Sequence, residues 1–257
     1  MKRVEDFTVL GQRWLNYKTY ILELEASSPL PPISPGNFAE IEVPNTNKIF
    51  LRRPFSVYDV DYHNRIVSFF VKVVGEGTRV LGNLRKGEKV NVIYPLGNSF
   101  TVPESGNVLV VAGGSGVAPF ILYGKELMKA GVGATFLFGA RNADEIVLTE
   151  QYKTYGKVLV TTEDGSMGEA GLVTQHSLFK RNDLHFDLIV TCGPNPMMKA
   201  VAGLARQKGI PCEASLENTM ACGFGACLCC VTPTTHGNLC VCTDGPVFNV
   251  NELKWQI

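Results

Sequence analysis

The stretch Val108-Leu-Val-Val-Ala-Gly113-Gly114-Ser115-Gly116-Val117-Ala118-Pro119 decides the fold. Its first five residues are a continuous apolar run, which is typical of a strand buried on both faces of a parallel sheet. The glycines predict a tight turn, and Pro119 fits the first turn of a helix, where its missing N–H costs nothing. A strand, a glycine turn and a helix in succession favour an α/β domain.

The glycine turn is also a candidate anion site. Glycines let the backbone approach a phosphate, and free N–H groups at a helix start favour negative charge. The spacing is not the G-x-G-x-x-G fingerprint, so an ordinary tight turn stays open as an alternative. Its position at the carboxyl end of a strand favours ligand binding, because such sheets bind ligands at that edge.

Strand-like and helix-like segments continue to alternate up to residue 217, which predicts a parallel sheet covered by helices on both faces. Cys192-Gly193-Pro194 ends one of these strands, ahead of Asn195 as the expected helix cap and Pro196 at the first helical position. The expected strands are Val108–Ala112, Ala134–Phe138, Val158–Thr162 and Leu188–Cys192, and the expected helices start near Pro119 and span Pro196–Gln207.

The preceding residues, 1–102, follow a different pattern. Short segments rich in Val, Ile, Phe and Tyr are separated by Pro and Gly clusters, which predicts an antiparallel sheet or small β-barrel. One short helix is expected from Thr78 to Asn83. The expected strands include Tyr17–Leu24, Asn37–Val43, Phe50–Val57 and Ile66–Val74.

The last part, residues 218–257, carries six of the eight cysteines. Cys222, Cys227 and Cys230 have the C-x4-C-x2-C spacing of a plant-type [2Fe-2S] site, and small residues between them let the loop wrap a compact cluster. The spacing leaves the fourth ligand open between Cys240 and Cys242. Zinc held by four thiolates is the main alternative, although paired C-x2-C knuckles would then be expected. A Rieske centre needs two histidines, and only His236 is near.

Composition excludes several classes of function. The chain has 257 residues, of which 45% are apolar and 19% charged, with 24 basic and 24 acidic residues. This balance favours a globular protein, with two domains of ordinary size more probable than one, and gives no sign of nucleic-acid or membrane-surface binding. We see no signal peptide and no segment of the ~20 apolar residues that a membrane span needs, so a cytoplasmic location is expected.

Two further motifs lie in the first part of the chain. Arg52-Arg53-Pro54-Phe55-Ser56 places cations and a hydroxyl on a strand, and Gly75-Glu76-Gly77-Thr78 forms a flexible turn before the short helix. Alone, the first could face solvent and the second could be an ordinary turn. In order, these motifs, the barrel exit Pro95–Asn98 and the glycine turn resemble the ferredoxin reductase-like flavoproteins. With the cysteine segment, the chain resembles the electron-transfer subunits of B-type dihydroorotate dehydrogenases.

The resemblance implies an FAD barrel over residues 1–102, an NAD-binding α/β domain over 103–217 and a [2Fe-2S] segment over 218–257. Arg53 would neutralise the FAD pyrophosphate and Ser56 would hydrogen-bond the flavin. The implied FAD residues are Arg53, Pro54, Phe55, Ser56, Phe70, Val71, Lys72, Gly77 and Thr78. The implied NAD residues are Gly113, Gly114 and Gly116 near the pyrophosphate, and Cys192, Gly193 and Pro194 near the nicotinamide.

In this family the fourth cysteine ligand precedes Asp-Gly-Pro-Val-Phe, so the resemblance selects Cys242 over Cys240. The implied cluster ligands are therefore Cys222, Cys227, Cys230 and Cys242, and Cys229 and Cys240 depart from the family pattern. An acid in Thr162-Glu163-Asp164-Gly165 could bind a ribose hydroxyl and favour NAD over NADP, although a capping or solvated acid fits equally well.

The resemblance also implies a direction of electron flow. Dihydroorotate would reduce FMN in a separate catalytic subunit, and electrons would pass through the cluster to FAD and then to NAD+, in a heterotetramer of two copies of each subunit that serves pyrimidine biosynthesis. Flavin is needed because nicotinamide exchanges hydride while the cluster moves single electrons. We expect no acid–base catalyst and no orotate or FMN site in this chain.

Three alternatives stay open. The small subunit of NADH-dependent ferredoxin:NADP oxidoreductases shares the architecture, but an aspartate replaces the first cysteine ligand there, and Cys222 argues against it. A second alternative is a stand-alone NAD(P)H reductase. A third, from a different class, is a non-catalytic zinc-binding interaction module.

Overall fold

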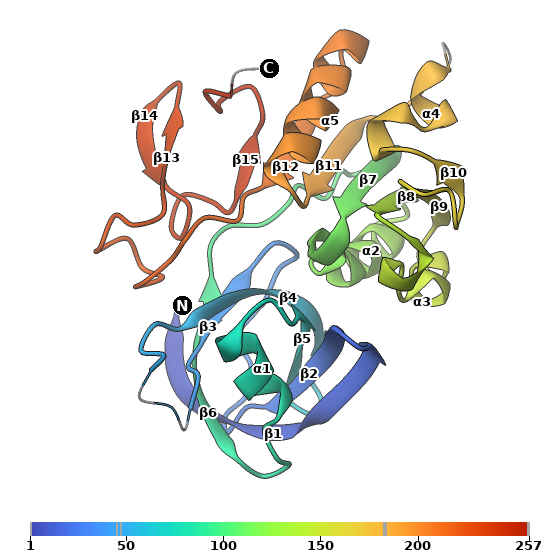
Figure 1. The fold of residues 1–257 in the computed structure, drawn as a ribbon. Coiled ribbons are helices and arrows are strands. Elements are labelled where there is room, and N and C mark those ends of the chain that lie inside the picture. Colours follow the sequence, from blue (N-terminus) through green and yellow to red (C-terminus); the bar gives the residue numbers. More distant parts are fainter. Residues whose placement is uncertain (1, 45, 47, 182–183, 256–257) are drawn as a thin grey trace.

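A computed structural model describes residues 2–255 except 45, 47, 182 and 183. The chain folds into a barrel, a seven-stranded sheet with helices on both faces, and a C-terminal hairpin beside the sheet (Figure 1). Among the described residues, no helix is both long and apolar enough to cross a membrane.

The barrel is a closed antiparallel sheet in the order β1-β2-β5-β4-β3-β6. Alternation explains its core: in β6, Val90, Val92, Tyr94 and Leu96 are buried while the residues between them are more exposed. The helix α1 lies against the barrel (Figure 1). The elements are β1 (Arg3–Asn16), β2 (Thr19–Glu25), β3 (Phe38–Ile41), β4 (Arg53–Asp61), β5 (Ile66–Lys72), α1 (Glu76–Gly82) and β6 (Lys89–Leu96).

The larger sheet has the order β10-β9-β8-β7-β11-β12-β15 and is parallel except for β15, which pairs antiparallel with β12. Successive residues of β7 supply two separate cores, because Leu109 and Val111 pack toward α5 while Val108 and Val110 pack toward α2. The strands are β7 (Asn107–Gly113), β8 (Gly133–Ala140), β9 (Lys157–Thr162), β10 (Glu169–Ala170), β11 (Leu188–Cys192), β12 (Cys212–Ser215) and β15 (Val247–Asn249). The helices are α2 (Phe120–Lys129), α3 (Thr149–Lys153), α4 (Ser177–Lys180) and α5 (Asn195–Lys208), with short 3-10 turns η1 (Gly114–Val117), η2 (Ala143–Glu145) and η3 (Val173–Gln175).

The C-terminal part contains the hairpin of β13 (Val231–Thr234) and β14 (Gly237–Cys240). The cysteine loop runs between β12 and β13, and the chain then returns to the sheet as β15. The expected boundary near residue 217 is therefore crossed by a strand pairing, and the division into residues 1–102, 103–217 and 218–257 stays a prediction.

Several expected boundaries were wrong by a few residues. The short helix begins at Glu76 instead of Thr78, and β4 covers Arg53–Asp61 instead of Phe50–Val57. Asn195 is not the helix cap: Pro194 caps the helix with φ −57° and ψ 135°, and its carbonyl accepts the N–H of Met198. Helix ends depend on which backbone groups find partners, and composition alone does not determine this.

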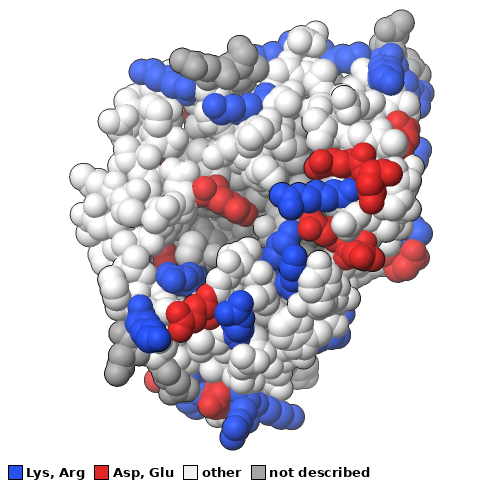
Figure 2. Space-filling model, in the orientation of Figure 1, with Lys and Arg blue, Asp and Glu red and all other residues white. Residues whose placement is uncertain are grey.

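The barrel and the sheet are joined directly by side-chain contacts, and Figure 2 shows a hollow between them with charged side chains at its rim. Each contact links a residue of β1, β4 or β5 to a helix or turn of the other domain. The pairs are Tyr58 Oη to Gln151 Oε1 at 2.6 Å, Asn16 Nδ2 to the Asp144 carbonyl at 2.8 Å, Lys72 Nζ to Glu145 Oε2 at 3.4 Å, and Lys125 to Asp59.

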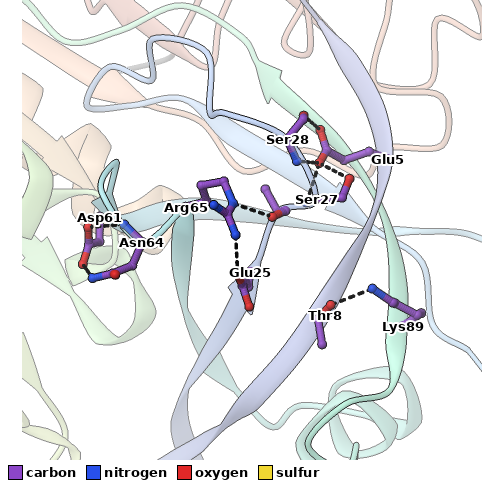
Figure 3. Close-up of polar contacts among 10 residues, drawn as sticks. Glu5, Thr8, Glu25, Ser27, Ser28, Asp61, Asn64, Arg65 and Lys89 are labelled. Carbon is purple, nitrogen blue, oxygen red and sulfur yellow. Dashed lines mark hydrogen bonds and ion pairs between the residues drawn. The ribbon is translucent and has the colours of Figure 1, made fainter.

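Polar contacts also fasten β1 to the rest of the barrel (Figure 3). Glu5 accepts hydrogen bonds from Ser27 and Ser28, and Lys89 on β6 donates to Thr8 at 2.7 Å. Burial opposes ionisation of Glu5, but these hydrogen bonds and one from Tyr94 hold its pKa below the usual value. The strand is therefore anchored although much of its surface is polar.

Candidate functional site

A cavity of about 410 Å³ lies between the barrel and the sheet and brings most of the predicted FAD residues together. Its wall is made by β4, β5, the start of α1, the η1 turn and the segment after β12. The predicted residues that line it are Arg53, Pro54, Phe55, Ser56, Phe70, Lys72 and Thr78. We call this the flavin cavity.

Two predicted FAD residues do not line the flavin cavity. Val71 is completely buried in the barrel core, because alternate residues of β5 point to opposite faces and Phe70 and Lys72 take the outer face. Gly77 lies behind the wall, where a Cβ would come within 3.0 Å of Arg53 Nε. Glycine at this position therefore leaves room for the Arg53 side chain.

Cations and a shaped turn make the flavin cavity suitable for a phosphate-bearing group. Arg53 donates to the carbonyl of Leu51 at 2.9 Å, which holds its guanidinium at the edge of β4. The Thr78 hydroxyl accepts the N–H groups of Val74 and Gly75, so Thr78 builds the turn before α1. A fixed guanidinium beside a glycine turn fits an anionic pyrophosphate.

A second cavity of about 410 Å³ opens at the carboxyl edge of the parallel sheet, and we call it the nucleotide cavity. Gly113, Gly114 and Pro194 from the prediction line it, together with residues from β8, β9 and α5. The Thr161 hydroxyl lies in its wall, is 1% exposed and has no hydrogen-bond partner. An unpaired buried hydroxyl facing a cavity fits a ligand that supplies the missing hydrogen bond.

Gly116, Cys192 and Gly193 lie behind the nucleotide cavity instead of lining it. A Cβ on Gly116 would lie 2.1 Å from the Cys192 carbonyl oxygen, so the glycine turn packs directly on the end of β11. Cys192 is buried, and this burial raises its pKa far above the usual value. These residues shape the wall through close backbone contact.

Sequence reasoning missed several residues of the nucleotide cavity. Glu163 was included in the predicted acidic turn and does line the cavity, whereas Asp164 bonds Ser166 within its own turn. Arg141 and Glu145 also line the cavity and were not predicted. Both follow β8, and the carboxyl end of that strand was the available signal.

Lys72 lines both cavities, so the flavin cavity and the nucleotide cavity meet at this residue. Its ammonium group is 3.4 Å from Glu145 Oε2, and both side chains are about one-quarter exposed. The two cavities are therefore neighbouring compartments with a shared wall.

The four predicted cluster ligands form two pairs. The N–H of Cys227 points at Cys222 Sγ over 3.5 Å, and the N–H of Cys242 points at Cys230 Sγ over 3.4 Å. Burial would raise the pKa of the Cys222 thiol, but the N–H groups of the loop, including those of Phe224 and Cys227, outweigh it and lower the pKa to about 6. The loop thus favours a thiolate at Cys222.

This donor set fits a two-iron cluster, in which each tetrahedral iron takes two thiolates and two bridging sulfides. The C-x4-C-x2-C spacing, in place of paired C-x2-C knuckles, favours [2Fe-2S] over zinc. Cys229 is exposed, and Cys240, although buried, donates its N–H to Asp244 Oδ2 at 2.7 Å.

The loop packs on the barrel through a residue that sequence reasoning missed. Glu40 on β3 is completely buried, and neither carboxylate oxygen has a hydrogen-bond partner. Burial raises its pKa to about 7. Alternation in Phe38-Ala-Glu-Ile-Glu42 marks Glu40 as an outward residue, and it is buried because the cysteine loop covers that face.

The cysteine loop is connected directly to the flavin cavity. Residues 215–220 line that cavity, and Cys222 follows two residues later. Pro246, after the last cysteine, lines the cavity as well. The cysteine loop, the flavin cavity and the nucleotide cavity therefore follow one another across the molecule.

Solved structures and family models define the class. The structure described as an NADH-dependent reduced ferredoxin-NADP oxidoreductase is similar over 97% of this chain and 90% of its own, with a TM-score of 0.88 and 30% identity. The FAD/NAD-binding domain of the Vibrio cholerae nitric oxide dioxygenase shares the fold, with a TM-score of 0.69 over 80% of this chain and 93% of its own, at 20% identity. Residues 110–203 match the oxidoreductase NAD-binding domain. The protein is a ferredoxin reductase-like oxidoreductase with an added iron–sulfur segment.

The particular family follows from the cysteine segment and from the relatives. Residues 217–254 match the iron-sulfur cluster binding domain of dihydroorotate dehydrogenase B. The electron transfer subunit of dihydroorotate dehydrogenase B (NAD(+)) from Fusobacterium nucleatum is 33% identical over 98% of this chain and 99% of its own, and that from Desulforamulus reducens is 34% identical over the whole of both chains. The chain belongs to this family of electron transfer subunits.

Proposed function

We propose that this chain carries electrons from a dihydroorotate-oxidising FMN subunit through a [2Fe-2S] cluster and FAD to NAD+ in pyrimidine biosynthesis. The observation that carries the proposal is the order of the three sites. Residues 215–220 run from the flavin cavity to Cys222, and Lys72 lines both cavities. Bound in this order, the groups form a short path for electrons.

Each site has its own residues in this proposal. Arg53 and Ser56 hold FAD, which when bound converts between single electrons and hydride. Gly113, Gly114 and Pro194 hold NAD(H) close to it, with Gly116 and Cys192 behind them. Cys222, Cys227, Cys230 and Cys242 hold the irons. The chain's own work is to fix positions and exclude water between the sites.

The entry point for electrons is the exposed side of the cysteine loop. Cys227 is exposed, and Phe224 and Leu228 beside it expose 55% and 63% of their surface. Residues 218–243 contain no Asp, Glu, Lys or Arg, and the surface over the β13–β14 hairpin is mostly uncharged (Figure 2). An uncharged apolar surface around the cluster suits a stable partner subunit.

The assembly that we propose is a heterotetramer with two copies of each subunit, as the family resemblance implies, so that one electron-transfer chain serves each catalytic subunit. A cytoplasmic location is proposed with it, since none of the eight cysteines forms a disulfide and a reducing compartment keeps thiols in that state.

Co-expression with the dihydroorotate-oxidising subunit of the same organism tests the function. We expect the two proteins to purify together, with flavin and [2Fe-2S] absorption and about two irons per FAD. The complex should reduce NAD+ with dihydroorotate. If the protein instead reduced ferredoxin with NADH and never bound that subunit, it would belong functionally with the ferredoxin:NADP oxidoreductases.

A further inference from the structure

The proposed reaction has a proton balance as well as an electron balance. An iron–sulfur cluster delivers electrons without protons, whereas NAD+ accepts a hydride: two electrons, one proton and NAD+ give NADH. One proton must therefore enter the flavin cavity for every NAD+ reduced. This requirement rests on the proposed function and holds only when electrons arrive singly.

Few groups in the flavin cavity can supply that proton. Of the described residues that line it, Arg53, Lys72 and Glu217 carry ionisable side chains. The guanidinium of an arginine does not deprotonate in proteins, the ammonium group of Lys72 is paired with Glu145 Oε2 at 3.4 Å, and the hydroxyls of Ser56 and Thr78 are very weak acids. Glu217 is the one carboxyl group in this lining.

Glu217 lies between the sheet and the cysteine loop. It follows the end of β12, where Ser215 pairs with Cys192 of β11. Its carboxyl group is close enough to the buried Cys192 thiol to interact with it electrostatically, so the two side chains are neighbours. Arg53 on β4 and Lys72 on β5 are the other ionisable residues in the lining of this cavity, and Cys192 on β11 is a neighbour. No hydrogen bond or ion pair with a described residue engages the Glu217 carboxyl group.

The surroundings of Glu217 suit a proton donor. Glu217 is an exposed residue, and its surface opens onto the flavin cavity. The walls of the cavity reduce the solvation of its carboxylate form, and this desolvation raises the pKa of Glu217 above the usual value. A carboxyl group keeps its proton nearer neutral pH under these conditions, as an effective general acid requires.

We infer that Glu217 supplies the proton that joins the two cluster-derived electrons at the flavin. The O–H bond of its carboxyl group breaks, the proton enters the flavin cavity, and the proton leaves with both electrons as the hydride of NADH. The carboxylate that remains regains a proton from solvent through the open side of the cavity. Glu217 is therefore not needed in a reaction in which one nucleotide gives a hydride to the flavin and another nucleotide removes it.

Two assays on the holoprotein separate these cases. In the first, reduced methyl viologen supplies single electrons and NADH formation is followed; in the second, NADH supplies hydride to thio-NAD+ through the flavin and no proton is taken up. We expect Glu217→Gln to slow the first reaction about 100-fold, the size of a typical general-acid effect, and to leave the second unchanged. Glu217→Asp should restore part of the first rate.

Glu126→Gln is the matched control, because Glu126 lies on α2 outside the flavin cavity and pairs with Lys129 at the surface; it should alter neither rate. The wild-type rate of the first reaction should fall as pH rises through the pKa of Glu217, and this pH-dependent fall should be absent in Glu217→Gln. Infrared spectra provide a readout without turnover: the C=O band of a protonated carboxyl, shifted in D2O, should disappear in that variant.

Equal loss of both reactions in Glu217→Gln would mean that the side chain only binds or packs the cofactor, and no loss of either would mean that the proton comes from elsewhere. Either result overturns the inference. Melting temperatures of both Glu217 variants show whether they are folded. A wild-type protein that binds no flavin and performs neither reaction would overturn the proposed function itself, so the two failures are distinguishable.

Discussion

Glu40 of the barrel and Gly223 of the cysteine loop are in direct contact: a Cβ on Gly223 would lie 3.0 Å from Glu40 Cγ. Gly223 also has a φ of +73°, which disfavours any side chain. We expect Gly223→Ala to displace the loop and to lower the iron content of the purified protein. Gly237→Ala is the control, since Gly237 also has a positive φ but has no atom within 4 Å of its Cβ position. Equal iron in both variants would contradict this.

Single cysteine replacements test the ligand set. Serine in place of Cys222, Cys227, Cys230 or Cys242 removes one thiolate from an iron, so the [2Fe-2S] absorption and the assayed iron and sulfide should be lost or strongly reduced. Cys229→Ser and Cys240→Ser should keep both. If Cys240→Ser lost the cluster and Cys242→Ser kept it, Cys240 would be the fourth ligand and Cys242 would not.

Two neighbouring arginines provide a matched pair for the flavin site. Arg53 lines the flavin cavity, whereas Arg52 is bonded to the Asn91 carbonyl at 2.8 Å and to Glu42. Arg53→Ala removes a charged hydrogen-bond donor worth about 1.5–3 kcal/mol, so the dissociation constant of FAD should rise roughly 10- to 100-fold. Arg52→Ala should leave it nearly unchanged. Equilibrium dialysis of the reconstituted apoprotein measures both values.

His176 should make stability depend on pH. Its Nδ1 accepts the N–H of Leu178 at 2.9 Å, which requires a neutral ring, and burial lowers its pKa below 6.5 despite the nearby Glu169. A lowered histidine pKa means that the unfolded chain binds more protons, so stability is present above pH 6.5 and falls as the pH drops below it. His176→Asn keeps an acceptor without titrating, and between about pH 7 and pH 5 its melting temperature should fall less than that of the wild type.

The uncharged surface around the cysteine loop predicts a partner complex that resists salt. Residues 218–243 offer no charge to screen, so the dissociation constant of the complex should change less than about twofold between low and high ionic strength. Introducing a lysine at Leu228, which is 63% exposed, should weaken association at every salt concentration. Strong weakening of the wild-type complex by salt alone would show that association depends on charges elsewhere.

Much of the architecture was predictable because it depends on local pattern. The apolar run at Val108–Ala112 predicted β7, and the Pro- and Gly-separated segments predicted the barrel. Two barrel strands, β1 and β6, were not among the expected strands. β1 in particular has charged residues such as Arg3, Glu5 and Asp6 and is half exposed, so its strand character appears only when β2 and β6 pair with it.

The residues of the candidate site also differ in whether local sequence is enough to predict their place. Spacing alone predicts Cys222, Cys227 and Cys230 as ligands, since ligand geometry constrains nearby residues, and family resemblance was needed to select Cys242. Val71 and Gly116 were predicted beside a cofactor, but Val71 faces the barrel core and Gly116 packs on β11. The side of a strand or turn that a residue faces depends on strand register and on the backbone packed beside it. A sequence motif contains no information on either.

The sequence by itself determined that a glycine turn follows a buried strand, that thiolates are spaced for two irons, and that cations stand on a barrel strand. These features are local, because a few adjacent residues specify the backbone or the ligand. Only the tertiary structure decided that Lys72 joins two cavities, that the loop buries Glu40 and that Glu217 lines the flavin cavity. Burial and proximity come from chain segments far apart in sequence, so they arise only when the barrel, the sheet and the cysteine loop pack together.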